Sequence, residues 1–174
     1  MVLLAREAFA DAEALLTSTR ETTERLRPGH PLHMALLSNL GTTYRSQGDL
    51  VRGEGIARDV LALRRQVQGD DHPDTASALR ALGLALEDQG KTDEAIVHLR
   101  EALAIQRQVL PRPHRNTVDT IRSLSRLVSP AEAVALLRDA VEQVEMLYPA
   151  GHRSIEGAQQ ALAEAEARAR QGSS

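Results

Sequence analysis

Hydrophobic residues recur every three or four positions along most of the chain, which is the spacing of helices that bury one face. The pattern is clearest over 75–89, where Leu79, Leu82 and Leu86 share a face until Gly90 interrupts it. Glycine adopts the left-handed conformation at a helix end at little cost. The spacing therefore predicts a helix over 75–89 that ends at Gly90.

A second apolar face follows this turn. Thr92 begins it, and Asp93 and Glu94 come next, where acidic side chains complement the helix dipole. Its apolar positions are Ala95, Leu99, Ala102, Leu103 and Ile105. The loop Pro111-Arg112-Pro113 ends the stretch, so the pattern predicts two helices joined by a short turn.

This helix pair is one copy of a repeat. Residues 30–71 align without a gap on residues 72–113, so each position recurs 42 residues later (72 − 30). A third copy begins at His114 and is shorter, because its successor His152 follows after 38 residues (152 − 114). The matching pairs mark the start and the turn of each copy, namely His30-Pro31 with His72-Pro73 and Gln47-Gly48 with Gln89-Gly90. Self-similarity at a fixed period predicts a repeat array.

The register extends the prediction to the other copies. Copy one should hold helices over about 33–47 and 50–67. Within the second of these, Gly53 aligns with Ala95, which predicts close helix packing, whereas the pattern offers no explanation for Gly55. In copy three, Ser129-Pro130-Ala131-Glu132 has the residues of a capping box and predicts a helix to about Tyr148.

The two ends of the chain differ from the repeats. Residues 2–27 read as one long helix, and the last helix should run over about 154–170 with the polar outer surface of a cap. The N-terminal helix carries apolar residues that no preceding helix covers, namely Leu3, Leu4, Phe9, Leu15 and Leu16. An uncovered apolar stripe predicts self-association through this helix.

The repeat resembles the tetratricopeptide repeat family, and most of all the 42-residue version found in kinesin light chains and many bacterial proteins. Copy two carries the resemblance in Leu82-Gly83, in the run from Gln89 to Ala95 and in the run from Leu99 to Leu103. It covers roughly residues 30–170. The departures are Gly53 and Ala57 in copy one and Arg115 and Ser125 in copy three.

The resemblance implies an all-α fold, a right-handed solenoid of antiparallel helix pairs with about eight helices. It implies one repeat domain over 1–174, divided into an N-terminal helix (1–29), repeat 1 (30–71), repeat 2 (72–113), a shortened repeat 3 (114–151), a capping helix (152–170) and a frayed tail (171–174). In this family the first helices line the concave face and bind peptides or partner proteins there.

Composition narrows the classes of function. A net charge of −3 gives no general reason to bind nucleic acid or an anionic membrane, and the absence of cysteine excludes disulfides and thiolate metal sites. No segment reaches 18 apolar residues, and the start is too short for a secretory signal, so we expect a cytoplasmic protein. Arginine outnumbers lysine 20 to one, which suggests a GC-rich bacterial genome.

The histidines invite a metal hypothesis that their spacing disfavours. One histidine begins each copy or the cap, so the four lie on successive loops and cannot converge on one ion. We expect them to have a structural role at helix starts, and we expect His33 and His98 to be solvated. No catalytic motif is present, so we expect neither an enzyme nor a cofactor.

One set of polar residues predicts a ligand groove. Arg80 and Arg122 occupy the same place in successive copies, and Arg126 follows one turn later. Arginine presents a planar fork suited to carboxylates, so these side chains predict an acidic ligand. The alternative is a solvated mixed-charge surface that Glu87, Asp88 and Asp119 neutralise. The candidate groove residues are Ser38, Asn39, Thr42, Arg45, Arg80, Asp88, Arg122 and Arg126.

Three functions follow from these features. The first is a scaffold or adaptor that binds a protein or peptide in the groove. The second is a regulatory sensor module of a larger bacterial signalling protein, which responds to a small peptide. The third, an enzyme, has no visible site to support it.

Overall fold

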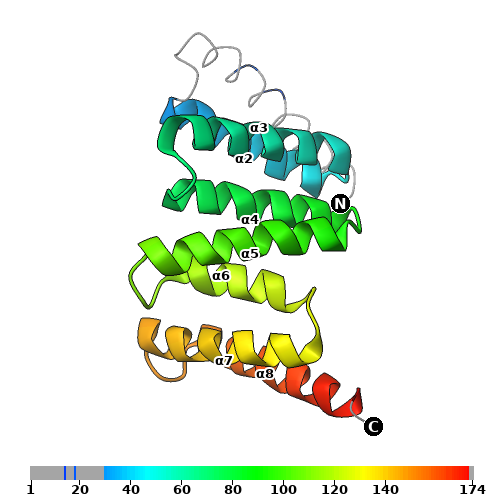
Figure 1. Cartoon of the computed structure of the whole chain (residues 1–174), viewed down its shortest axis with the longest axis vertical. Coiled ribbons are helices and arrows are strands. Elements are labelled where there is room, and N and C mark those ends of the chain that lie inside the picture. The colour runs from blue at the N-terminus through cyan, green and yellow to red at the C-terminus, as the bar shows by residue number, and fades with distance from the viewer. Residues whose placement is uncertain (1–13, 15–17, 19–29, 173–174) are drawn as a thin grey trace. The chain divides into compact units, whose positions relative to one another are not determined.

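The computed structural model describes residues 14, 18 and 30–172, and its elements are shown in Figure 1. Residues 30–172 form helices and no strand. The seven helices are α2 (Pro31–Ser46), α3 (Leu50–Gln68), α4 (Pro73–Asp88), α5 (Thr92–Val109), α6 (Arg115–Ser125), α7 (Pro130–Leu147) and α8 (Arg153–Gln171). The predicted N-terminal helix, and the self-association assigned to it, fall almost wholly outside the described residues. The prediction of an all-α fold is confirmed.

Helices α2 and α4 begin two residues earlier than the hydrophobic pattern predicted. They start at Pro31 and Pro73, directly after a histidine, and not at His33 and Thr75. Proline suits the first position of a helix, because its φ angle is fixed near the helical value and no N–H is lost that would otherwise bond. The turn residue Gly90 has a φ of 74°, which confirms the predicted left-handed helix end.

The four repeat-initial histidines cap the helices that follow them. In each case the ring Nδ1 accepts a hydrogen bond from the backbone N–H two residues later, which satisfies one of the donors left open at a helix start. The N···N distances are 3.2 Å at His30, 3.1 Å at His72, 3.1 Å at His114 and 3.2 Å at His152. The predicted structural role is confirmed. Over residues 30–172, no group of three histidine, cysteine or acidic side chains could hold a metal ion.

Replacing one of these caps tests their contribution. We expect His72→Ala to lower the free energy of unfolding by about 1 kcal/mol, because the Asp74 N–H loses its acceptor. Asparagine is a strong N-cap, so His72→Asn should retain most of the stability. Urea denaturation followed by circular dichroism measures both. Equal losses in the two variants would show that the imidazole contributes packing rather than a cap.

The residues divide into two compact units that meet within the first turn of α5, between Ala95 and Ile96. In the first unit, α3 packs against both α2 and α4, and α2 also touches α4. The core consists of side chains at most 6% exposed on these three helices, among them Met34, Leu37, Leu40, Val60, Leu61, Leu79, Leu82 and Leu86. Three adjacent helices therefore present a continuous surface in this unit.

Two facing glycines bring α2 and α3 close together. A Cβ added at Gly53 would lie 2.6 Å from the Arg45 Cγ and 3.2 Å from the Gly41 carbonyl oxygen. A Cβ at Gly41 would lie 3.1 Å from the Ile56 Cγ2. The predicted close packing at Gly53 is confirmed. Gly55, by contrast, faces open space within the same helix.

These neighbouring glycines predict opposite effects of the same substitution. Gly55→Ala should raise the free energy of unfolding by about 0.5–1 kcal/mol, because alanine favours the helix and meets no atom. Gly53→Ala should lower it by about 1–3 kcal/mol, because the added methyl overlaps α2. Chemical denaturation of the two variants decides this, and a stabilising Gly53→Ala would disprove the close contact.

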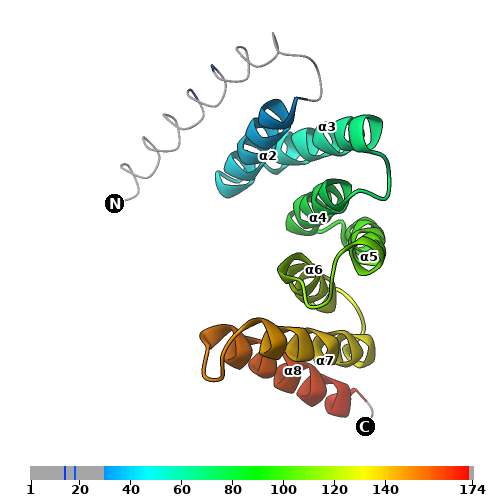
Figure 2. The ribbon, with the colours of Figure 1, turned by 90° about the vertical axis from the view of Figure 1, so that its left-hand side faces the viewer.

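The second unit contains α6, α7 and α8 together with α5 from Ile96 onward. Helix α7 packs against α6 and α8, and Figure 2 shows α7 and α8 side by side. The main core cluster joins residues of all four helices, and they are Leu99, Leu103, Val118, Ile121, Leu124, Ala140, Val144, Ile155 and Ala158. Helix α6 has 11 residues where α4 has 16, in line with the shortened third repeat.

The capping box predicted at the start of α7 is only half formed. The Ser129 hydroxyl accepts the Glu132 N–H at 3.4 Å, as expected. The Glu132 carboxylate, however, accepts from the Arg100 guanidinium of α5, with both oxygens 2.9 Å from Nη2. A tertiary ion pair therefore takes the group that the local pattern assigned to the cap.

Candidate functional site

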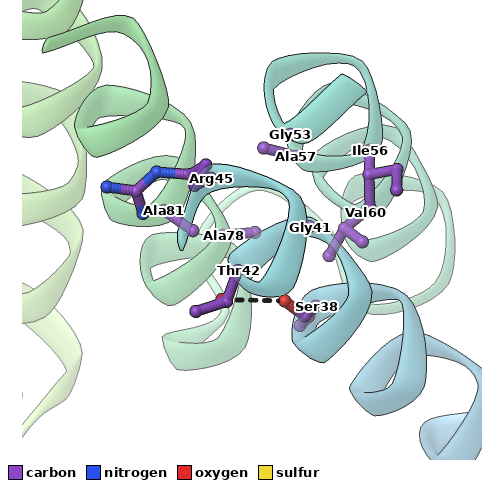
Figure 3. A pocket seen from close by; sticks show the side chains of 10 residues that line it. All are labelled: Ser38, Gly41, Thr42, Arg45, Gly53, Ile56, Ala57, Val60, Ala78 and Ala81. Carbon is purple, nitrogen blue, oxygen red and sulfur yellow. Dashed lines mark hydrogen bonds between the residues drawn. The ribbon is translucent and has the colours of Figure 1, made fainter. Parts of the chain in front are cut away.

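A hollow of about 310 Å³ lies where α2, α3 and α4 meet. Three of the predicted groove residues line it, namely Ser38, Thr42 and Arg45, all from α2 (Figure 3). Its other walls are small or apolar, and they come from Gly41 of α2, from Gly53, Ile56, Ala57 and Val60 of α3 and from Ala78 and Ala81 of α4. The hollow therefore combines an apolar lining with a polar edge on one helix.

The two hydroxyl groups at this edge already donate their protons. The Ser38 Oγ donates to the Met34 carbonyl at 2.8 Å, and the Thr42 Oγ1 donates to the Ser38 carbonyl at 3.0 Å. Both residues are exposed. A hydroxyl that has donated can still accept. Ser38 and Thr42 are thus suited to accept hydrogen bonds from a ligand.

The predicted groove residues of the first unit differ in whether their side chains already have a partner. Arg45 pairs with Asp88, with the Nε and Nη2 atoms each 2.7 Å from Oδ2, so this part of the predicted cationic strip is neutralised. Arg80 is half-buried, and no carboxylate of residues 30–172 lies within ion-pair distance of it. Asn39 is exposed, and its side-chain amide bonds to no other described residue.

The remaining predicted residues belong to the second unit. Arg122 lies on the exposed side of α6, and Arg126 is the residue that follows this helix. The Arg126 Nη1 donates to the Arg122 carbonyl at 3.4 Å. Asp119, which we considered as a neutralising partner of Arg122, is instead 3.9 Å from Arg115. Each unit stands by itself, so a strip that runs from Arg80 to Arg122 stays a prediction.

The turn between α2 and α3 ends in an acidic residue that caps α3. Asp49 caps α3 by accepting the Arg52 N–H at 3.1 Å, and this backbone hydrogen bond, together with the Arg52 guanidinium, holds the pKa of the Asp49 carboxyl below its ordinary value. A lowered pKa means that the cap contributes fully above the ordinary aspartate pKa and is lost as the pH falls through the lower value. The Arg52 guanidinium also lies 4.4 Å from the centre of the Tyr44 ring.

Comparison with known proteins identifies this architecture. A family model described as tetratricopeptide repeat matches residues 32–108, the stretch that carries α2 to α5. This stretch is therefore similar to tetratricopeptide repeats. No curated protein matches the chain significantly.

Solved structures extend the similarity of fold over nearly the whole chain. One solved structure from Podosopora anserina is described as kinesin light chain nearly identical TPR-like repeats, and it superposes with a TM-score of 0.80 at 24% identity. The superposition covers 96% of this chain and 82% of that one. BtubC (BKLC) from P. vanneervenii superposes with a TM-score of 0.75 at 16% identity, over 97% and 73%. The chain therefore has the tetratricopeptide repeat fold, with kinesin-light-chain-like neighbours.

Tetratricopeptide repeat proteins are in general scaffolds for protein interaction and not catalysts. Among the helices described, none is both long enough and apolar enough to cross a membrane.

Sequence reasoning missed the most buried charge of the first unit. Glu54 is 4% exposed, and its Oε2 accepts from the Lys91 Nζ at 2.8 Å and from the Gln89 amide. Arg58, one turn along α3, pairs with Glu54 and lies 3.6 Å from Glu94. The available signal was the alignment of Glu54 with Ile96, which places a carboxylate at an apolar position of the repeat.

The two histidines that do not begin a repeat, His33 and His98, also differ from expectation. His33 is 8% exposed and therefore buried, and the His98 side chain is 25% exposed with Nδ1 4.0 Å from a Glu101 oxygen. The prediction of solvation was wrong for His33, which is buried, whereas His98 is half-buried. Both are nevertheless in helices that belong to the repeat pattern.

Proposed function

We propose that this tetratricopeptide region holds an extended peptide segment of a partner protein on the exposed surface of the first helices of its N-terminal unit, α2 and α4. The observation that carries the proposal is the lining of this hollow, because apolar walls from three helices with hydroxyl acceptors at the edge suit a small apolar peptide side chain and the adjacent backbone. A peptide N–H would donate to Ser38 or Thr42.

The free amide and guanidinium groups set the chemistry of the segment. The Asn39 amide offers both a donor and an acceptor to a peptide backbone, which is the pairing that such a backbone needs. Arg80 and Arg122 keep guanidinium groups without a carboxylate neighbour among the described residues, and each has donors suited to a carboxylate. These features favour a segment with a small apolar anchor and acidic residues nearby.

The experiment selects peptides from a randomised display library with the purified chain and measures them by fluorescence anisotropy. Ala81→Phe fills the hollow from α4 and should abolish binding of the selected peptide, because Ala81 is exposed and lines the hollow. Ala104→Phe is the matched control, since Ala104 is an exposed alanine on α5, a second helix. Equal binding by both variants and the parent would exclude the hollow as the anchor site.

The acidic preference has its own measurement. We expect the triple variant of Arg80, Arg122 and Arg126 to alanine to weaken binding by about 1.5–3 kcal/mol for each charge-assisted hydrogen bond that is lost. Affinity of the parent should fall as salt rises, since exposed charges are screened over about 8 Å at physiological ionic strength. Arg153→Ala is the control, because Arg153 is an exposed arginine on α8. Salt-independent binding to an unaffected triple variant would exclude an acidic ligand.

A further inference from the structure

A second hollow, of about 430 Å³, lies in the C-terminal unit, beside the loop from α5 to α6. Gln106 of α5, Leu110 directly after that helix, Thr117 of α6 and Asp139 and Gln143 of α7 line it. Most of its lining residues are polar or charged, unlike those of the hollow proposed for the peptide. It lies on different helices from α2, α3 and α4, and nothing in the proposed function uses it.

The side chain of Gln106 is buried in the wall of this hollow without a partner. The residue is 1% exposed, and neither its Nε2 nor its Oε1 has a hydrogen-bond partner among the described residues. Burying an amide without a compensating hydrogen bond costs about 1–3 kcal/mol, so folded proteins pair nearly all such groups. The amide therefore offers two N–H donors and one oxygen acceptor to whatever enters the hollow.

The preceding repeat shows what the same position does when it is satisfied. Arg64 stands 42 residues before Gln106 (106 − 64), and its Nη1 donates to Asp74 at 2.7 Å and to Gln68 at 3.1 Å. The equivalents of Asp74 and Gln68 are Asn116 and Leu110. All three members of this network are thus replaced in the next repeat. The shorter glutamine side chain faces a hollow in place of a carboxylate.

The charges around the hollow are already balanced. Asp139 accepts from Arg107 at 2.8 Å and from Arg112 at 3.0 Å, and Glu142 accepts from Arg112 at 2.7 Å. Two cations therefore face two carboxylates, and a charged ligand gains no net attraction. Gln143 is also satisfied, because it accepts the His114 N–H at 3.3 Å and donates to Asp139 at 3.1 Å. Unused hydrogen-bonding capacity is concentrated at Gln106.

We propose that this hollow binds a neutral carboxamide, which Gln106 holds by a reciprocal pair of hydrogen bonds. The Gln106 Nε2–H donates to the ligand carbonyl, and the Gln106 Oε1 accepts a ligand N–H. A carboxamide is the group that supplies one acceptor and one donor side by side without charge. It can belong to a free primary amide or to an asparagine or glutamine side chain of a polypeptide.

The test follows the side-chain amide signals of the ¹⁵N-labelled full chain during titration. Propionamide is the neutral probe, propionate is its charged isostere, and N-acetylglutamine N-methylamide presents the carboxamide as a side chain. We expect saturable shifts of the Gln106 NH₂ signals with propionamide and none with propionate. If the glutamine derivative binds more tightly than propionamide, the source is a polypeptide; the reverse order indicates a free amide.

Two variants complete the test. Gln106→Leu removes the amide at similar volume, and loss of two neutral hydrogen bonds should weaken propionamide binding about tenfold to thirtyfold. The double variant Gln106→Arg, Asn116→Asp restores the arginine–aspartate pair of the preceding repeat, fills the hollow and should abolish binding while its helical circular dichroism is unchanged. The proposal is overturned if propionamide gives no saturable shift in the parent, which is the result expected if Gln106 binds only an ordered water. It is also overturned if both variants bind propionamide as tightly as the parent does.

Discussion

Leu103→Ala should lower the free energy of unfolding by about 2–5 kcal/mol, which is a large part of the stability of a domain of this size. Leu103 is 4% exposed on α5 and packs in the cluster that joins α5, α6, α7 and α8. Truncation removes apolar contacts and leaves a cavity that the helices around it fill only partly. Leu82→Ala, at a residue 2% exposed on α4, should cost a similar amount in the first unit.

The measurement is urea denaturation with circular dichroism as the signal. Val97→Ala is the matched control, because Val97 lies on the same helix as Leu103 and is 62% exposed. We expect that control to change stability by no more than about 0.5 kcal/mol, as for other surface substitutions. A loss below about 1 kcal/mol in both leucine variants would mean that these side chains are not the core residues that their burial indicates.

The features that sequence predicted well are those that depend on short-range chemistry. The left-handed conformation of Gly90 after α4 depends only on the backbone of that turn. His72 caps α4 through a hydrogen bond to the backbone of a residue two positions away. The register of the repeat then transferred each feature to the other copies. The grouping of Ser38, Thr42 and Arg45 at one hollow was also within reach, since their spacing places them on one face of one helix.

Features that depend on contacts between helices were not predictable in the same way. The Glu132 carboxylate binds Arg100 of another helix, so the local capping pattern assigned it to the wrong partner. The Arg45–Asp88 pair joins residues 43 positions apart, and it turns a predicted ligand-binding cation into a neutralised one. Sequence spacing identifies which face a side chain occupies, but the partner depends on which helix lies opposite.

The buried carboxylate of Glu54 leads to the last prediction. Lys91→Met should lower the free energy of unfolding by about 3 kcal/mol, because removing one partner of a buried ion pair leaves a charge poorly compensated. Glu54 remains in its site at 4% exposure with Arg58 and Gln89, whereas the lysine is 41% exposed. Removing the Glu54 carboxylate should not cause such a loss of stability, because Lys91 and Arg58 can both be solvated once the carboxylate is gone.

Glu54→Ile should therefore be neutral or stabilising, as is common when a buried ion pair is replaced by an apolar side chain of similar volume. Isoleucine is the residue of the next repeat at this position, Ile96. In the Glu54→Ile background, Lys91→Met should cost less than about 0.5 kcal/mol, so the double-mutant cycle should give a coupling energy of more than about 2 kcal/mol. Additive effects in that cycle would mean that the lysine stabilises the α4–α5 turn without the carboxylate. A strong coupling would identify Glu54 as the residue that ties α3 to this turn through charge, at a position where the next repeat uses an apolar side chain.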